Sequence, residues 1–137
     1  NLGIMAEAGS FLVLWEKDEA QSWEGETPPR SAGNHMKGLA RGDTIFLSAY
    51  DSAELYLLGA IAVSSVGIEA SGRFRGLPYA GGKSLAGPFQ MLPLGSLKWR
   101  LRFENTASPR LSRTRSLLWQ VRSRRRLTPA SAKLLLA

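Results

Sequence analysis

Residues 23–47 read WEGETPPRSAGNHMKGLARGDTIFL, a loop rich in Pro and Gly that leads into an apolar strand. The turn Arg41-Gly42-Asp43 stands where the loop becomes the strand. Many recognition sites are built this way, because a loop carries the binding groups while a sheet holds the loop in position. Arg and Lys suit phosphate, and Asn suits a base edge. The stretch therefore predicts a binding loop, whose polar members are Arg30, Ser31, Asn34, His35 and Lys37.

Apolar runs on both sides of this loop predict a small sheet. The clearest run is residues 54–65, in which Gly59 is expected at a bulge or a close approach of strands. No alternation of strand and helix follows, so a doubly wound parallel sheet is not expected. The prediction is an α+β fold: a mostly antiparallel curved sheet or pseudo-barrel with short peripheral helices. The predicted strands are residues 11–15, 44–50, 54–65, 68–74, 89–94 and 97–103.

Two further segments have a distinct pattern. Residues 75–88 are dominated by Gly, Pro, Ser and Lys without an apolar period, which predicts a long loop. In residues 97–103, apolar and aromatic residues alternate with Lys98, Arg100 and Arg102, which predicts a strand with a cationic outer face.

The C-terminal part of the chain predicts two short helices. Residues 113–124 fit a helix face or a strand, and we favour a short helical segment. Thr128 is placed to cap a last helix, with Pro129 at its first position. The predicted buried side of that helix consists of Ala132, Leu135 and Leu136.

Length and composition limit the classes of protein. A chain of 137 residues predicts one domain, and the absence of Cys excludes disulfides and thiolate chemistry. The longest apolar run, residues 55–63, is too short to span a bilayer, and no secretory signal is visible. We expect a cytoplasmic protein with no membrane partner. Residues 1–4 before Met5 suggest a vector-derived addition, and the apolar end at residues 134–137 suggests that the domain, residues 5–137, was cut from a longer chain.

Charge is distributed unevenly along the chain. Residues 1–97 contain seven Lys and Arg against ten Asp and Glu, a net charge of −3. Residues 98–137 contain eleven Lys and Arg against Glu104 alone, a net charge of +10. Such polarity predicts a face that meets a polyanion. The alternatives are a solvated basic tail and a protein-interaction module whose basic segment binds an acidic partner.

The residues offer little for catalysis. A Ser-His-Asp triad would need His35 with Ser31 or Ser48 and Asp43 or Asp51, but no nucleophile-elbow pattern surrounds a serine. No ligand spacing for a metal is present, and no cofactor is expected. The segment Gly81-Gly82-Lys83-Ser84 lacks the glycine that a phosphate-binding loop needs at position 77. We therefore expect that the protein is not an enzyme. The alternative is an enzyme that acts on a small molecule or nucleotide, with His35 as the base.

The four tryptophans predict different roles. Trp15 and Trp99 lie in apolar runs and are expected in the core, while Trp119 is expected to be half-buried beneath the basic segment. Trp23 stands beside the polar loop and is the best candidate for stacking on a base, a contact that contributes roughly 1–3 kcal/mol.

The order of these features resembles the EVE domain, a member of the PUA-like superfamily related to YTH domains. The likeness covers most of the chain and begins with Phe11 to Trp15, followed by Trp23, Arg30 to Asn34, Lys37 and Gly42-Asp43. Its later parts are Leu58 to Val63, Leu94, Leu97, Leu101 to Phe103, Trp119, Val121-Arg122, Leu127 and Ala132. The glycine-rich residues 75–88 and the pair Pro28-Pro29 depart from the family pattern.

The resemblance implies a curved sheet that presents a pocket for one extruded nucleobase. Relatives are thought to read modified bases in DNA or RNA, and some serve modification-dependent restriction systems beside a nuclease. No nuclease motif occurs in this chain, so a partner domain or protein would have to cut. We expect modified DNA to be favoured over RNA.

These arguments give three sets of expected site residues. The base pocket would contain Trp23, Ser31, Asn34, His35 and Tyr50, with Met36, Leu39 or Tyr50 as an apolar wall for a methyl group. The phosphate backbone would meet Arg30, Lys37, Arg110, Arg113, Arg115, Arg122 and Arg124. Leu77 or Tyr79, in a loop that becomes ordered on binding, would act as a wedge in the gap left by the base.

Overall fold

The computed structural model of the chain describes residues 8–15, 30–33, 36–72, 74–85, 90–104, 111–113, 116–122 and 124–136. Its strands are β1 (Ser10–Trp15), β2 (Arg30–Ala32), β3 (Thr44–Asp51), β4 (Glu54–Ile68), β5 (Pro78–Ser84), β6 (Leu92–Pro93) and β7 (Arg125–Leu127). Its helices are the 3-10 helix η3 (Gly95–Arg100) and the α-helices α2 (Leu117–Val121) and α3 (Pro129–Leu136).

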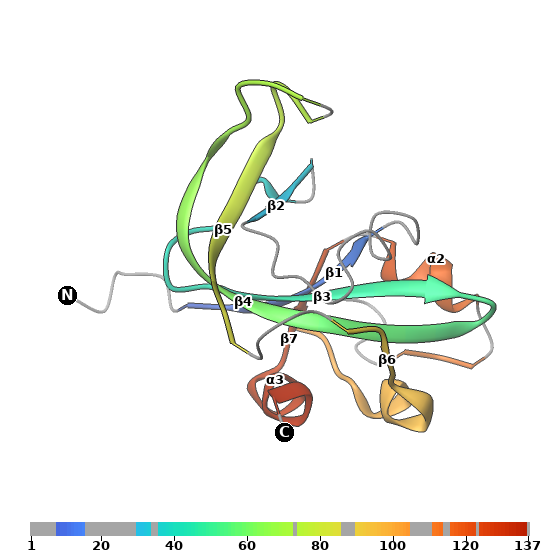
Figure 1. The fold of residues 1–137 in the computed structure, drawn as a ribbon. Helices are drawn as coiled ribbons and strands as arrows, with labels where there is room; N and C mark the ends of the chain where they lie inside the picture. The colour runs from blue at the N-terminus through green and yellow to red at the C-terminus, as the bar shows by residue number, and fades with distance from the viewer. Residues whose placement is uncertain are drawn as a thin grey trace.

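The strands form one seven-stranded mixed sheet in the order β2-β5-β4-β3-β1-β7, with β6 paired to β4. Strands β1 and β3 run parallel, and the other pairs are antiparallel. Strands β4 and β5 bend upward together as a hairpin arm, with β2 beside β5 (Figure 1). The described strands do not close into a barrel. The prediction of a curved, mostly antiparallel sheet is therefore confirmed at the level of an α+β fold.

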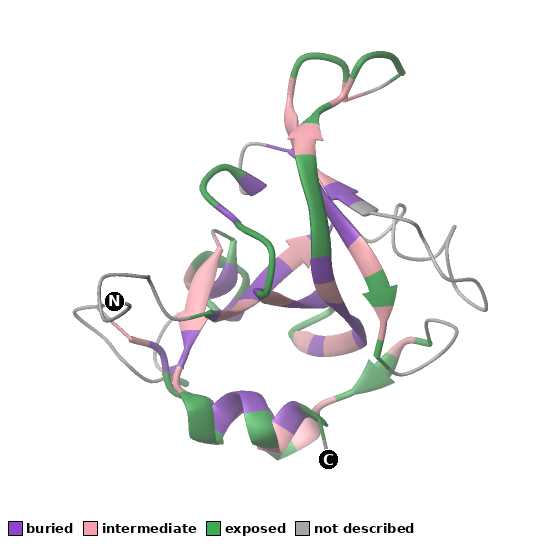
Figure 2. Cartoon of the chain, turned by 90° about the vertical axis from the view of Figure 1, so that its left-hand side faces the viewer, coloured by how far each residue is buried: buried purple, intermediate pink, exposed green. Residues whose placement is uncertain are grey.

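The sheet separates two hydrophobic clusters. Because successive side chains of a strand point to opposite faces, Ile45 and Leu47 of β3 enter the first cluster while Phe46 enters the second. The first cluster also contains Trp15, Met36 and Leu39, and the second contains residues of α2, β7 and α3. Helices α3 and η3 lie beneath the sheet in Figure 1, and the buried residues concentrate in its central strands while the tip of the arm is exposed (Figure 2).

The predicted strands at residues 11–15, 44–50 and 54–65 are confirmed as β1, β3 and β4. The pairing of β3 with β4 skips one residue, Leu58, so the bulge lies next to the predicted Gly59. The predicted strand at 68–74 is wrong, because β4 ends at Ile68 and turns follow.

The prediction of a long loop at residues 75–88 is wrong, because seven of these residues form β5. The glycines there serve close approach between strands. A second register shift leaves Ser64 of β4 unpaired opposite β5, and a Cβ atom on Gly82 would collide with the Ala62 carbonyl oxygen. Gly67 likewise leaves room for the Tyr79 ring, to which a Cβ atom would approach within 2.9 Å. Glycine content therefore predicted a loop where it marks a tight strand pair.

The predicted strand at residues 97–103 is also wrong. Residues 95–100 form η3, and the later part of the segment contributes only an isolated bridge from Phe103 to Leu127. The predicted cationic outer face is wrong for Lys98, which is buried, whereas Arg100 and Arg102 are exposed. Of the strand predicted at residues 89–94, the structure retains the two residues of β6.

Both C-terminal helices are confirmed. Residues 117–121 form α2, and the Ser131 amide donates a hydrogen bond to Thr128 Oγ1 (3.3 Å) at the start of α3. Ala132 and Leu135 are buried as predicted, whereas Leu136 is exposed. None of the described helices has the length and apolarity that crossing a bilayer requires.

Candidate nucleic-acid interface

The edge strand β7 presents arginines on both faces of the sheet. Residue 126 lies opposite Phe11 in the pairing of β7 with β1. The guanidinium carbons of Arg124 and Arg126 lie 4.8 and 5.7 Å from the centre of the Phe11 ring. Alternate residues of a strand share a face, so these two arginines flank one aromatic ring. A cation over a ring face is attracted by the ring quadrupole, which holds both guanidinium groups near this edge.

Arg124 also joins β7 to the predicted binding loop. Its Nη1 donates a hydrogen bond to the Lys37 carbonyl oxygen at 2.7 Å, across 87 positions of sequence. Partial burial lowers the pKa of the Arg124 guanidinium, and the nearby Asp43 carboxylate opposes that shift. The group stays protonated because arginine begins from a very high pKa. The fold thus brings a C-terminal arginine against the residue that follows Asn34, His35 and Met36.

Arg125 faces the other side of the sheet. Its guanidinium carbon lies 4.0 Å from the centre of the Phe103 ring, and its Nη1 donates to the Gln120 carbonyl oxygen at 3.2 Å. Partial burial lowers the pKa of this guanidinium too. These contacts attach α2 to β7 and make Arg125 a structural residue more than a surface one.

Two of the arginines predicted to contact phosphate, Arg113 and Arg122, are exposed and lie over tryptophan rings. The Arg122 guanidinium carbon is 3.5 Å from the centre of the Trp119 ring, and that of Arg113 is 5.5 Å from the centre of the Trp99 ring. Trp99 is partly buried against the second cluster, in keeping with its predicted core position. Trp119 is about half-buried, as predicted, with 53% of its surface exposed and Arg122 of the basic segment over its ring.

Several predicted site residues lie outside the described residues: Trp23, Asn34, His35, Arg110 and Arg115. The backbone of Arg30 belongs to β2, and Lys37 is exposed in the turn before β3. Of the predicted backbone contacts, the structure therefore brings Lys37 and Arg124 together and puts Arg113 and Arg122 at separate tryptophans.

The described members of the predicted base pocket do not share one face. Ser31 is buried, and its Oγ accepts a hydrogen bond from Trp15 Nε1 at 2.8 Å. Met36 and Leu39 belong to the same first cluster as Trp15. Tyr50 instead packs against the second cluster. The prediction that Tyr50 and Ser31 line one base pocket is therefore wrong, because a single base cannot contact both faces of the sheet.

The groups considered for a catalytic triad are engaged in structural hydrogen bonds. Buried Ser48 donates from Oγ to the Val13 carbonyl oxygen at 2.8 Å. The buried Asp43 carboxylate accepts from the amides of Gly9 (2.9 Å) and Ala40 (3.0 Å), which stabilises the turn before β3. The fourth candidate, Asp51, accepts a hydrogen bond from Ser52 Oγ at 3.2 Å. The prediction for His35 stays untested, because His35 lies outside the described residues.

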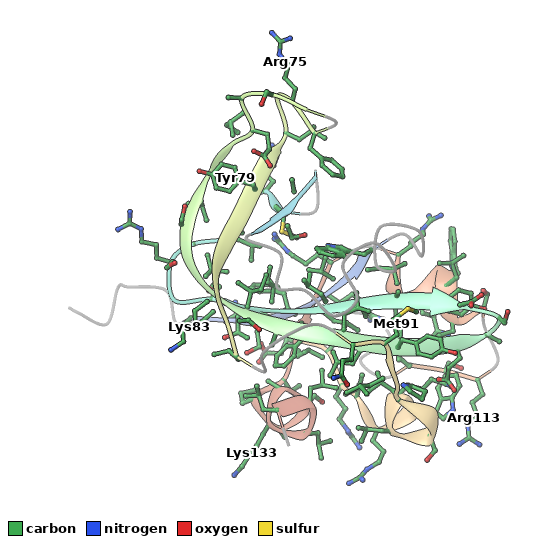
Figure 3. All side chains as sticks on the ribbon, in the orientation of Figure 1. Arg75, Tyr79, Lys83, Met91, Arg113 and Lys133 are labelled. Carbon is green, nitrogen blue, oxygen red and sulfur yellow. The ribbon has the colours of Figure 1, made fainter. Side chains whose placement is uncertain are left out.

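The wedge prediction for Leu77 and Tyr79 requires correction. It assumed a loop that becomes ordered on binding, but Tyr79 lies within β5 with its ring against Gly67, and Leu77 directly precedes that strand. Figure 3 shows Tyr79 along the hairpin arm and Arg75 projecting from its tip. A paired strand cannot insert into a duplex as a flexible wedge would.

Sequence reasoning missed Phe11 and Arg126 as parts of this edge. A signal was present, since Arg122, Arg124 and Arg126 recur with the period of a strand. The register against β1, which places Phe11 between two of these arginines, has no counterpart in local sequence.

Comparisons with known proteins add no family. No protein-family model matches the chain, and a search of the curated proteins finds no match. Among solved structures, a hypothetical protein from Leishmania major is similar over 95% of this chain and 93% of its own, with 10% identity and a TM-score of 0.45. Within the described residues, no group of three or more His, Asp or Glu side chains is arranged to hold a metal ion.

Proposed function

We propose that the chain is a non-enzymatic nucleic-acid-binding domain of the PUA-like type, which reads a modified base flipped out of DNA. RNA is the less favoured substrate. A nuclease partner, as a domain or a separate protein, would carry out any cleavage. The resemblance to EVE domains suggested this function, and the distribution of cations gives it independent support.

The observation that supports it most is the hydrogen bond from Arg124 to the Lys37 carbonyl oxygen. It sets the arginine-rich strand β7 beside the loop whose residues include Asn34 and His35. Phosphate contacts position a protein on nucleic acid, and base contacts specify the sequence or modification. A loop that contacts the base, with cations from a second segment beside it to contact phosphates, would combine the two kinds of contact.

The energetic scheme requires both parts. Extruding a base costs a few kcal/mol of lost stacking and pairing. Stacking of the base on Trp23 would contribute roughly 1–3 kcal/mol, and Asn34 can both donate to and accept from a base edge. Contacts from Lys37 and the C-terminal arginines to phosphates would supply affinity that is independent of sequence and sensitive to salt.

The test is a binding screen with duplexes that are identical except for one modified cytosine or adenine. We expect the parent to prefer at least one modified duplex over the unmodified one. Asn34→Ala and Trp23→Ala should lose that preference while their thermal melting matches the parent. A parent that binds all duplexes equally, or none, would contradict base reading, and intact preference in both variants would move the pocket elsewhere.

A matched pair of lysine variants tests the position of the backbone contacts. Lys37→Gln and Lys133→Gln each remove one exposed charge, but Lys133 lies on α3 and points away from the sheet (Figure 3). We expect Lys37→Gln to lower affinity for every duplex and to reduce the salt slope by about 0.9, with Lys133→Gln near the parent. Equal effects of the two variants would indicate a diffuse charge effect without a defined face.

A further inference from the structure

Trp119 is the large aromatic residue that the fold leaves most open to solvent among the described residues. It lies on α2 between Leu117 and Val121, which are both buried in the second cluster. The helix is therefore anchored by its neighbours, while Trp119 keeps 53% of its surface exposed and Leu118 beside it keeps 43%. Large exposed apolar side chains that adjoin each other are informative, because burying them would stabilise the fold.

The indole ring of Trp119 is already ordered by a cation. The guanidinium carbon of Arg122 lies 3.5 Å from the ring centre, which is the separation of two stacked planar groups. Arg122 covers part of the ring, and the exposed surface that remains is available to a second planar group. Both guanidinium planes and aromatic rings are surfaces on which nucleobases stack.

The mounting of α2 is rigid. Gln120 Oε1 accepts from the Ser112 amide at 2.6 Å, and Gln120 Nε2 donates to the Ser112 carbonyl oxygen at 2.7 Å. Arg125 of β7 donates a hydrogen bond from Nη1 to the Gln120 carbonyl oxygen. A surface ordered before binding costs less conformational entropy when a ligand arrives.

The charge around Trp119 selects the kind of ligand. Two cations lie at α2: Arg122 is over the Trp119 ring, and Arg125 Nη1 donates to the Gln120 carbonyl oxygen. An aromatic surface beside cations is complementary to a base attached to phosphates. It is less suited to a neutral apolar peptide, which would gain nothing from the surrounding charge.

We propose that Trp119, stacked on Arg122, binds one unpaired nucleotide of a single-stranded segment next to the bound duplex. The proposal rests on the proposed function and adds a second contact outside the base pocket. The arginines nearby would hold the phosphates on either side of the stacked base. The protein would accordingly favour sites with a single-stranded tail, gap or loop.

The experiment compares a blunt duplex carrying the preferred modified base with the same duplex extended by a six-nucleotide thymidine tail. We expect the parent to bind the tailed duplex more tightly. Trp119→Ala should weaken binding to the tailed duplex by roughly 5- to 100-fold and binding to the blunt duplex much less, because only the ordering of Arg122 is lost there. Trp119→Phe should keep most of the affinity, because a planar ring remains for stacking.

The matched control is Leu118→Ala, which removes the adjacent exposed apolar side chain without touching the Arg122 contact. It should change affinity for either duplex by less than about two-fold. Thermal melting of all three variants should match the parent, since the side chains at positions 118 and 119 are exposed.

The outcomes separate this inference from the proposed function. If the parent binds the blunt modified duplex but shows no gain from the tail, the proposed function stands and the stacking site is wrong. The same conclusion follows if Trp119→Ala binds both duplexes like the parent, or weakens both equally. A parent that binds no nucleic acid overturns both proposals.

Discussion

Two segments of this chain look alike in sequence and differ in their use of charge. Both are rich in cations and end in apolar or aromatic residues: residues 97–103 read LKWRLRF and alternate strictly, whereas residues 121–127 read VRSRRRL, with four arginines between Val121 and Leu127. In the first segment the first cation, Lys98, is buried, and its Nζ lies 2.9 Å from Glu54 Oε2. In the second, Arg122 and Arg124 contact aromatic rings and a backbone carbonyl, none of which removes their charge.

We infer from this difference that a cation is available to a polyanion where no buried carboxylate pairs with it. Glu54 lies 44 positions before Lys98 and belongs to β4, so its approach depends on the fold and not on local sequence. In the second segment Arg126 forms an ion pair with Glu104, and both side chains are more than one-third exposed. A contact with an aromatic ring fixes the position of a guanidinium group without neutralising its positive charge, which can then attract a polyanion.

The largest expected effect is on stability, from Lys98→Met. The change leaves the Glu54 carboxylate without its buried partner, at an expected loss of about 1–3 kcal/mol in the free energy of unfolding. Glu54 is 29% exposed, so water can compensate part of the loss. Urea unfolding measures it, with Arg100→Met on the same 3-10 helix as control. Equal stability of the two variants would mean that the pair contributes nothing, and the contrast between the segments would fail.

The next effect concerns nucleic-acid binding and compares two double variants of equal charge. Arg113→Gln with Arg122→Gln removes cations near Trp99 and Trp119, whereas Arg100→Gln with Arg102→Gln removes two exposed cations of the first segment. The first pair should lower affinity for a blunt duplex on the order of ten-fold and reduce the salt slope by up to about 1.8. The second pair should leave both close to the parent. A reversed result would transfer the interface to the face below the sheet.

The fold was predictable where one face pattern decides the structure. Strands β3 and β4 follow from their apolar runs. Asp43 stabilises the turn before β3, because its carboxylate accepts hydrogen bonds from the amides of Gly9 and Ala40. The pattern failed at β5, where glycines allow close strand approach, and at residues 97–103, where an alternation typical of a strand stands in a 3-10 helix. In both cases β4 supplies a contact, to Gly82 of β5 and to Lys98 of η3, that local sequence does not specify.

The candidate site was predictable by composition and not by geometry. The excess of arginine after residue 98 predicts a polyanion-binding face in this segment, and the binding face stays a prediction. The partners of each arginine were not predictable: Phe11 for Arg124, Phe103 for Arg125 and Trp119 for Arg122. Tyr50 is predicted in the base pocket but packs on the opposite face of the sheet. One step along a strand decides which face a side chain joins, and the composition of the segment does not specify that step.

The third prediction uses pH to sharpen the same contrast. The hydrogen bond from Lys98 lowers the pKa of the Glu54 carboxyl, while partial burial opposes the shift. A depressed carboxyl pKa stabilises the fold above the ordinary Glu range, near pH 4.3, and that stability is lost as pH falls through the folded value. The gap in unfolding free energy between the parent and Lys98→Met should therefore shrink below about pH 4. A gap of constant size down to pH 2 would mean that Lys98 acts through packing and not through Glu54.

The smallest effect is expected from Glu104→Gln, which removes the one carboxylate of the basic C-terminal region. Its Oε2 lies 3.0 Å from Arg126 Nε, with the two side chains 38% and 37% exposed, so the stability cost should be only about 0.2–1 kcal/mol. Arg126 would then be available to a phosphate, so affinity for nucleic acid should rise slightly and the salt slope should steepen by up to about 0.9. Glu69→Gln, which makes the same charge change just beyond β4 on the hairpin arm, is the matched control and should leave the slope unchanged. If both variants steepen the slope alike, net charge alone governs binding, and the ring-ordered arginines of the second segment would have no special position.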